Sequence, residues 1–484
     1  MSGIGKSIRT LGVLACVAFS AARTAPAQPA AEPQLTDEEK LYGLSLIWKE
    51  VDYNFAFFDQ VPDLDWDSAY RAFIPQILAA EHVFEYYRTL QRFLALLKDG
   101  HTNVYFPRDV ELGAWVDKPW IVLREVEHRA VVSNVEAALA DDLPIGSEIL
   151  AVDGIPVKEY LERNVFPYVA ACSERVLWDR AIRGNLSRRY GLLVGPPGSE
   201  VRIAARTPDG EVREVIATRD RLSRESEYVP PLPDRPDLEF RQLEAGIAYV
   251  ALNSFGDREI VGEFEAILPE LRQATGVVLD LRRNGGGSDS NALGILNHLA
   301  RDTLVGPAWR TRVHNAAFKA WGRNAGEQPW AARYWDYYMG DVWEESAPGR
   351  MVPPPGDKVS APIMVLIGRN TASAAENFLV VLDPLPNVTF VGEPTEGSTG
   401  QPLHFDLPGG GSARVVVKRN TYPDGRDYVG VGIQPDVPVD VTLEDIRVGR
   451  DAVLERAVRL LSTCVGDGEP TVCQPAIGLR WRPT

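Results

Sequence analysis

The sequence is poor in cysteine and histidine, with four cysteines and six histidines in 484 residues. The histidines are scattered, and no group of Cys and His has the spacing of a zinc site, so we expect no metal and no other cofactor. Cys464 and Cys473 are close enough in sequence to pair as a disulfide, which would leave Cys172 as a small buried residue.

Basic residues are outnumbered, with 51 Lys and Arg against 67 Asp and Glu and a formal net charge of −16. This balance argues against nucleic acid as the main partner, because phosphate binding needs clustered Lys and Arg. No apolar run is long enough for a transmembrane helix. The chain also lacks a P-loop and a G-x-S-x-G elbow, which disfavours nucleotide binding and the α/β-hydrolase fold.

The first 27 residues have the pattern of a secretory signal peptide. Lys6 and Arg9 precede an apolar segment at 11–22, and Ala25-Pro26-Ala27 supplies the small residues of a cleavage site. We therefore expect export to the periplasm or the extracellular space. A lipoprotein cysteine at Cys16 is the less favoured alternative, because the apolar run before it would be very short.

The length predicts several domains. Helical periodicity at 33–98 begins at a capping box, Thr36 and Glu39, and ends at Gly100, which leaves His101 just beyond a helix end. The later half alternates strands with helices and so predicts a parallel sheet. We expect a signal peptide (1–27), an N-terminal helical domain carrying His101 (33–107), a β-rich domain (112–222), a Pro-rich linker (223–236), an α/β catalytic core (237–447) and a C-terminal helix and tail (448–484).

Two segments within these domains carry further signals. Residues 145–157 place two strands around Asp153-Gly154 and resemble the PDZ pattern, which implies binding of an extended C-terminal peptide. Retention of that binding is left open. Residues 305–356 hold five of the eleven tryptophans. This insertion could form a lid or substrate wall, or equally a satellite core.

Ser373 stands where a buried strand, Ile363–Ile367, gives way to an Ala-rich helix. The residue could cap the helix or serve as a nucleophile, because free N–H groups and the positive end of the helix dipole gather there. In an open α/β sheet, ligands bind at the carboxyl ends of the strands. The glycine turn after residue 281 ends another strand, so the N–H of Gly285 or Gly286, together with that of Ala374, could form an oxyanion hole.

Four ordered motifs carry a family resemblance: Asp280 to Gly287, Thr371 to Glu376, Gly392 to Thr395 and Gly432 to Asp436. Together they resemble the C-terminal-processing (tail-specific) serine peptidase family. The resemblance implies a crotonase-like (ClpP/crotonase) α/β core, hydrolysis of peptide bonds without a metal, and a polypeptide substrate with an exposed C-terminal segment.

The base differs from the bacterial tail-specific branch. That branch has a Lys a few residues beyond the Gly-Glu-Pro-Thr motif, and Ser398 stands there instead. Asp99-Gly100-His101-Thr102 is similar to the tricorn-like branch, in which a histidine activates the serine. That branch orients its histidine with a preceding Ser and a distant Glu, and neither is present here. Asp99, Glu396, Asp427 or a backbone carbonyl are the candidates for orienting His101.

We therefore expect an exported serine endopeptidase in which His101 takes the proton of Ser373. Replacing Ser398 should then leave most activity. Lys418 is an alternative base. A catalytically inactive peptide- or ligand-binding protein on the same fold, and an exported esterase, are the rival functions. The oligomeric state is not predicted.

Overall fold

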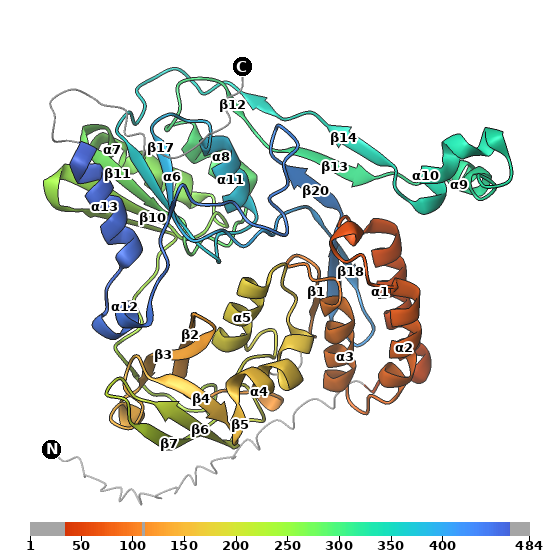
Figure 1. Cartoon of the computed structure of the whole chain (residues 1–484), viewed down its shortest axis with the longest axis horizontal. Helices are drawn as coiled ribbons and strands as arrows, with labels where there is room; N and C mark the ends of the chain where they lie inside the picture. Colours follow the sequence, from red (N-terminus) through yellow and green to blue (C-terminus); the bar gives the residue numbers. More distant parts are fainter. Residues whose placement is uncertain (1–33, 109–111, 465–484) are drawn as a thin grey trace, which may run out of the picture.

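The computed structural model describes residues 34–108 and 112–464. Figure 1 shows an N-terminal helical unit and a small β-sheet unit lying against a larger α/β core, from which one long hairpin projects. The predicted signal peptide, the alternative at Cys16, the partner cysteine Cys473 and the end of the predicted tail lie outside the described residues. They stay predictions.

The helical unit contains α1 (Asp37–Asn54), α2 (Trp66–Leu78) and α3 (Val83–Ala95). The predicted capping box at Thr36 is present, with both reciprocal hydrogen bonds formed. After α3 the chain enters a short strand, β1 (Asn103–Tyr105), which pairs antiparallel with β19 (Ser412–Val416) of the core. This pairing fixes the segment that carries His101 against the core.

The β-rich unit is a twisted antiparallel sheet with its own hydrophobic core. The predicted turn at Asp153-Gly154 joins two paired strands, β4 and β5. Residues 228–229 pair with β3, so part of the predicted Pro-rich linker belongs to this sheet. The PDZ assignment stays a prediction. The elements are β2 (Ile121–Val126), β3 (Arg129–Glu136), β4 (Glu148–Val152), β5 (Ile155–Pro156), α4 (Val157–Asn164), α5 (Glu174–Arg183), β6 (Glu200–Arg206), β7 (Val212–Thr218) and β8 (Tyr228–Val229).

The α/β core is built on a sheet of order β21-β17-β16-β11-β10-β9, parallel except for β9. This confirms the predicted α/β class. Its strands are β9 (Leu238–Gln242), β10 (Ile247–Leu252), β11 (Gly276–Asp280), β16 (Ile363–Ile367), β17 (Val388–Gly392) and β21 (Val437–Pro438). Its helices are α6 (Glu259–Ala266), α7 (Leu268–Gln273), α8 (Asp289–Leu296), α11 (Ala374–Leu382), α12 (Leu443–Val448) and α13 (Ala452–Cys464).

Both faces of this sheet are covered, which explains why its strands are almost wholly apolar. Alternate residues of each strand enter different clusters. In β16, for example, Ile363 and Val365 pack with residues of α8 and α11, whereas Met364 packs on the other face with residues of α13. The carboxyl ends of the parallel strands are thereby held at one edge, where the candidate site lies.

The tryptophan-rich insertion forms an arm rather than a wall of the site. β13 (Ala308–Arg312) and β14 (Trp343–Ser346) extend from the core beside β20 (Lys418–Thr421), and α9 (Ala316–Gly322) and α10 (Trp335–Met339) lie at the tip (Figure 1). Phe318, Trp321 and Tyr334 pack their rings together there. These rings form a small cluster, but Trp321 remains exposed, so a buried satellite core stays a prediction. The remaining strands are β12 (Leu304–Val305) with β15 (Arg350–Met351), and β18 (Pro402–Asp406) beside β19.

None of the helices in the described ranges combines the length and the apolar character needed to cross a membrane.

Candidate active site

Ser373 occupies the turn between β16 and α11, as the sequence predicts. It stands at the N-cap position, but its side chain makes no capping hydrogen bond. Its backbone is held at φ 57° and ψ −125°, a conformation that residues other than glycine rarely adopt. Such strain costs about 1–3 kcal/mol and persists only where the surroundings impose it. Because the side chain does not cap the helix, the Ser373 hydroxyl is available to another partner.

The glycine turn after β11 lies directly against Ser373. A Cβ atom on Gly286 would come within 2.5 Å of the Ser373 Cβ atom, so only glycine allows this approach. The N–H of Gly286 is donated to Asn284 Oδ1. In the described part of the chain, the N–H groups of Gly285, Gly287 and Ala374 donate no hydrogen bond, and all three residues line the cavity beside Ser373. Of the two predicted glycines, Gly285 is thus the one with an available donor.

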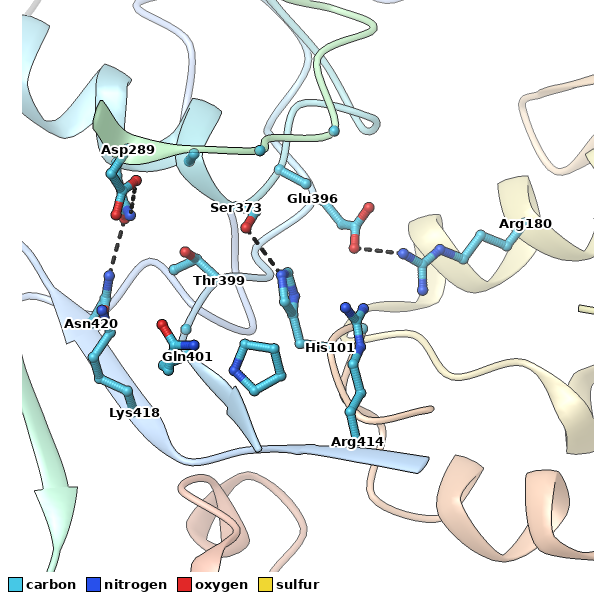
Figure 2. A pocket seen from close by; sticks show the side chains of 18 of the residues that line it. His101, Arg180, Asp289, Ser373, Glu396, Thr399, Gln401, Arg414, Lys418 and Asn420 are labelled. Carbon is cyan, nitrogen blue, oxygen red and sulfur yellow. Dashed lines mark hydrogen bonds and ion pairs between the residues drawn. The ribbon is translucent and has the colours of Figure 1, made fainter. Parts of the chain in front are cut away.

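His101 reaches Ser373 from the helical unit, across 272 residues of sequence. Its Nε2 atom lies 3.1 Å from Ser373 Oγ, within hydrogen-bonding distance (Figure 2). The segment is anchored on both sides of the ring. The backbone N–H of His101 donates to Asp99 Oδ2, and β1 begins two residues later on β19.

The other ring nitrogen is held by a residue that the sequence analysis did not consider for this role. His101 Nδ1 lies 2.5 Å from Ser398 Oγ. When Nε2 is the acceptor for the Ser373 hydroxyl, Nδ1 carries the hydrogen and donates it to Ser398 Oγ. Gly100 explains the access, since a Cβ atom there would lie 2.5 Å from the Ser398 hydroxyl oxygen.

None of the three carboxylates proposed to orient His101 contacts its ring. Asp99 binds the backbone N–H of His101. Glu396 is ion-paired with Arg180 at 2.6 Å. Asp427 is paired with Arg419 and does not line the cavity. The expectation that Ser398 is dispensable is also at odds with its hydrogen bond to His101. From the sequence, Ser398 only occupied the position of the missing lysine, and nothing indicated that His101 lies beside it.

Glu376, which lies in the first turn of α11, holds the loop that carries Ser398. Its carboxyl group accepts hydrogen bonds from the Thr395 hydroxyl at 2.5 Å, from Gly397 N–H at 2.8 Å and from Ser398 N–H at 3.0 Å. Ser398 in turn accepts the N–H of Ser373 on its carbonyl oxygen at 2.9 Å. The burial of Glu376 raises the pKa of its carboxyl group to about 8, against the opposing effect of these hydrogen bonds.

Burial is also the main influence on His101. It lowers the pKa of the imidazole to about 3, and the positive charges of Arg414, Arg180 and Arg188 lower it further in the same direction. The ring is therefore neutral at pH 7 and able to accept a proton.

The Ser373–His101 pair opens onto a cavity of about 530 Å³. Lys418, the alternative base, also lines this cavity, but its ammonium group makes no hydrogen bond with any described residue and lies 5.9 Å from the centre of the Trp309 ring. Figure 2 shows Lys418 on the side of the cavity away from Arg180. The geometry thus favours His101 over Lys418 as the base.

Sequence reasoning missed the roles of Ser398, Glu376 and Asn284. Asn284 is fully buried. Its side-chain amide donates to Leu252 O and accepts the N–H of Gly286, and its backbone carbonyl oxygen accepts the N–H of Ala372. The signal that was available is the presence of polar residues inside otherwise apolar or glycine-rich motifs, which need partners if they are buried.

Comparisons with known proteins agree with this fold. Residues 246–439 match the family model described as Peptidase family S41. A carboxyl-terminal-processing protease of Picosynechococcus sp. is 25% identical over 367 residues, which cover 73% of this chain and 72% of that protein. A chloroplastic carboxyl-terminal-processing peptidase 2 of Arabidopsis thaliana is 27% identical, over 51% of this chain and 42% of that one. The solved structure of mature CPAF complexed with lactacystin is similar in fold, with a TM-score of 0.66 and 16% identity over 88% of this chain and 98% of that one.

The α/β core and these similarities define a serine peptidase. More specifically, residues 246–439 match peptidase family S41, which confirms the resemblance to the C-terminal-processing peptidases.

Proposed function

We propose that this chain is an exported serine endopeptidase in which Ser373 is the nucleophile and His101 the general base. The observation that carries the proposal is the 3.1 Å separation of His101 Nε2 and Ser373 Oγ. His101 has a second hydrogen bond to Ser398, and its low pKa keeps it neutral. Two successive hydrogen bonds thus connect the proposed nucleophile to its base and the base to a group that orients it.

The reaction follows the usual course of acyl transfer. Ser373 Oγ attacks the scissile carbonyl carbon while its proton moves to His101 Nε2. The N–H groups of Ala374 and Gly285 donate to the oxyanion that forms. His101 then gives the proton to the leaving amine. In the second half, His101 takes a proton from water, the water oxygen attacks the acyl carbon, and Ser373 Oγ leaves and takes the proton back from His101. The substrate we propose is an unfolded polypeptide or an exposed C-terminal segment, because the relatives process carboxyl termini.

A fluorophosphonate probe tests nucleophile and base together. We expect labelling of the wild-type protein at Ser373, no labelling of Ser373→Ala, and labelling of His101→Ala slowed by at least about 100-fold. His404→Ala is the matched control, because His404 is an exposed histidine on the neighbouring strand β18 and should label at the wild-type rate. Wild-type labelling of His101→Ala would overturn the assignment of the base.

The same preparations separate the rival functions. Failure of the wild-type protein to label or to cleave an unfolded peptide would favour the inactive binding protein. Turnover of esters without peptides would favour the esterase. For export, we expect the N-terminus of protein recovered from the periplasm or medium to follow Ala27, and an intact leader in all fractions would contradict it.

A further inference from the structure

The cavity beside Ser373 is lined by more positive than negative side chains, although the whole chain carries a formal charge of −16. Its ionised lining residues are Arg180, Arg188, Arg414 and Lys418 against Asp289 and Glu396. Glu396 is already paired with Arg180, and Asp289 accepts a hydrogen bond from Asn377. Arg188 and Arg414 form no ion pair within the described ranges, although the Asp99 carboxyl group interacts electrostatically with Arg414.

Arg414 is placed close to the base by the sheet register. It stands opposite Asn103 in the β1–β19 pair, two residues from His101. Its Nε atom is buried and has no hydrogen-bond partner among the described residues. Figure 2 shows its guanidinium group beside His101, pointing toward the Arg180–Glu396 pair. A buried guanidinium nitrogen without a partner is costly unless a ligand supplies one.

Arg188 approaches the same place from the loop that follows α5. The loop is fixed on the helical unit, because the Gln91 side chain donates to Arg188 O. The guanidinium carbons of Arg188 and Arg414 lie 4.5 Å and 5.6 Å from the centre of the Tyr105 ring. Both arginines are therefore held beside one aromatic ring of β1, and their donors need no large rearrangement to meet an anion.

The positive lining continues into an adjoining cavity of about 280 Å³, which shares Arg180 and Arg188 with the first. Arg183 and Arg283 are added there, and Glu396 is its only acidic lining residue within the described ranges. Arg283 is exposed and forms no ion pair with a carboxylate in the described ranges. A substrate that leaves the Ser373 cavity on this side meets a surface of guanidinium groups.

The positive side chains around the cavity affect the proposed reaction, because His101 itself becomes positive during it. When His101 takes the Ser373 proton, the ring becomes positive, and its Nδ1 partner is a neutral hydroxyl rather than a carboxylate. The neighbouring arginines repel that charge. An anion bound to them would reduce this repulsion in the transition state, where it lowers the barrier most effectively.

We propose that Arg188 and Arg414 form a carboxylate-binding subsite that engages the substrate next to the scissile bond. The carboxylate belongs either to an acidic side chain or to the C-terminus of the substrate. Arginine suits this role because its fork of N–H donors matches a carboxylate. The proposal rests on the assignment of Ser373 and His101 as the catalytic pair.

Four versions of one unfolded reporter peptide separate the two sources of the carboxylate. The internal position near the scissile bond is Glu or Gln, and the C-terminus is a free acid or an amide. We expect the wild-type kcat/KM to be about 10- to 100-fold higher for the version that carries the preferred carboxylate. An advantage of Glu over Gln in amidated peptides identifies a side chain. An advantage of the free acid over the amide identifies the C-terminus.

The variants Arg188→Gln and Arg414→Gln test the subsite. We expect the ratio of kcat/KM between carboxylate and amide peptides to fall to within about 3-fold in each, and Arg414→Lys to recover only part of it, because lysine keeps the charge but loses the fork. Lys418→Gln is the matched control, since it removes one positive charge from the same cavity and should leave the ratio near that of the wild type. An equal loss in Lys418→Gln would reduce the effect to general electrostatics and overturn the subsite.

A binding measurement separates failure of the subsite from failure of the catalytic assignment. Fluorescence anisotropy of the four peptides with Ser373→Ala reports recognition without turnover. A carboxylate preference there, lost in Ser373→Ala/Arg414→Gln, supports the subsite even if the wild type proves inactive. Equal binding of all four peptides, with equal wild-type turnover, contradicts the subsite and leaves the nucleophile and base intact.

Discussion

The two halves of the candidate site are built in different ways. Ser373 is placed by the core sheet, at the end of one buried strand and against the glycine turn of its neighbour. His101 is placed by segments that come hundreds of residues later, through β19 and through Ser398, which is 297 residues away. The proposed nucleophile is thus placed by the regular part of the fold, whereas the proposed base depends on contacts between separate units.

The chemistry of the two halves differs as well. Ser373 is held in a strained backbone conformation with free N–H groups near it, so its environment is fixed before substrate arrives. His101 is held by side-chain hydrogen bonds in a buried, positively charged setting. Perturbing the base should therefore change rate and pH dependence, while perturbing the nucleophile's backbone should change stability.

The largest effect that separates the halves is expected at Ser398. Ser398→Ala removes the acceptor for Nδ1–H and frees the ring to rotate or change tautomer, so kcat should fall by about 10- to 100-fold with little change in KM. Thr399→Ala is the control, because Thr399 is the neighbouring hydroxyl in the cavity and does not contact the ring. Peptide turnover that stays above half of the wild-type value would return Ser398 to the dispensable role expected from sequence.

The pH dependence gives the next effect. The proposed general base can act only while His101 is neutral, and its lowered pKa of about 3 keeps it neutral well into the acid range. We expect kcat/KM to stay flat from pH 7 to pH 5, where a histidine with the ordinary pKa of about 6.5 would lose activity by more than about 10-fold. Initial rates, measured over the pH range in which the protein stays folded, give this acid side of the kcat/KM profile. An acid limb near 6.5 would mean that the ring is more hydrated than the structure shows.

Glu376 should make the folded state sensitive to alkali. Its carboxyl pKa is raised from 4.5 to about 8 on folding, so the stability it contributes is fully present below 4.5 and is lost as the pH rises through 8. We expect the Tm of the wild type to fall by several degrees more than that of Glu376→Gln between pH 6 and pH 9. Glu263→Gln, an exposed glutamate of α6, should follow the wild type. Parallel curves for all three proteins would show that Glu376 is ionised throughout.

The smallest effect concerns the backbone of Ser373. Glycine adopts positive φ without strain, so Ser373→Gly should be more stable than Ser373→Ala by about 1 kcal/mol, although both lack the proposed nucleophile. Urea unfolding of the two variants gives the difference. If Ser373→Ala proves the more stable, the turn is not strained and the comparison of the two halves loses that part of its basis.

The difference between the Ser373 half and the His101 half of the site also explains how much could be predicted from the sequence. The strand before Ser373, the glycine turn and the helix end before His101 follow from local periodicity and turn chemistry, and these patterns singled out both members of the proposed pair. The hydrogen bond to Ser398 could not be read, because it depends on the register of β1 with β19 and on the space left by Gly100. Carboxylates near in sequence, such as Asp99, proved to bind backbone instead.

The boundaries between units were the weaker part of the reading. Tyr228 and Val229 stand in a segment crowded with proline, yet they pair with β3. Proline content marks where regular structure is interrupted but does not report which neighbour an extended segment joins. The tryptophans of the insertion show the same limit, because composition alone did not separate a substrate wall from the arm seen in Figure 1.

The pairing of β1 with β19 also determines the stage of folding at which the proposed catalytic pair can form. The histidine comes early in the chain, but the strand that seats it ends at Val416. A nascent chain, or one still being threaded across a membrane, has His101 long before it has the strand that aligns the ring with Ser373. In the proposed mechanism the protein is therefore harmless to its own biosynthetic machinery until folding of the core is almost complete.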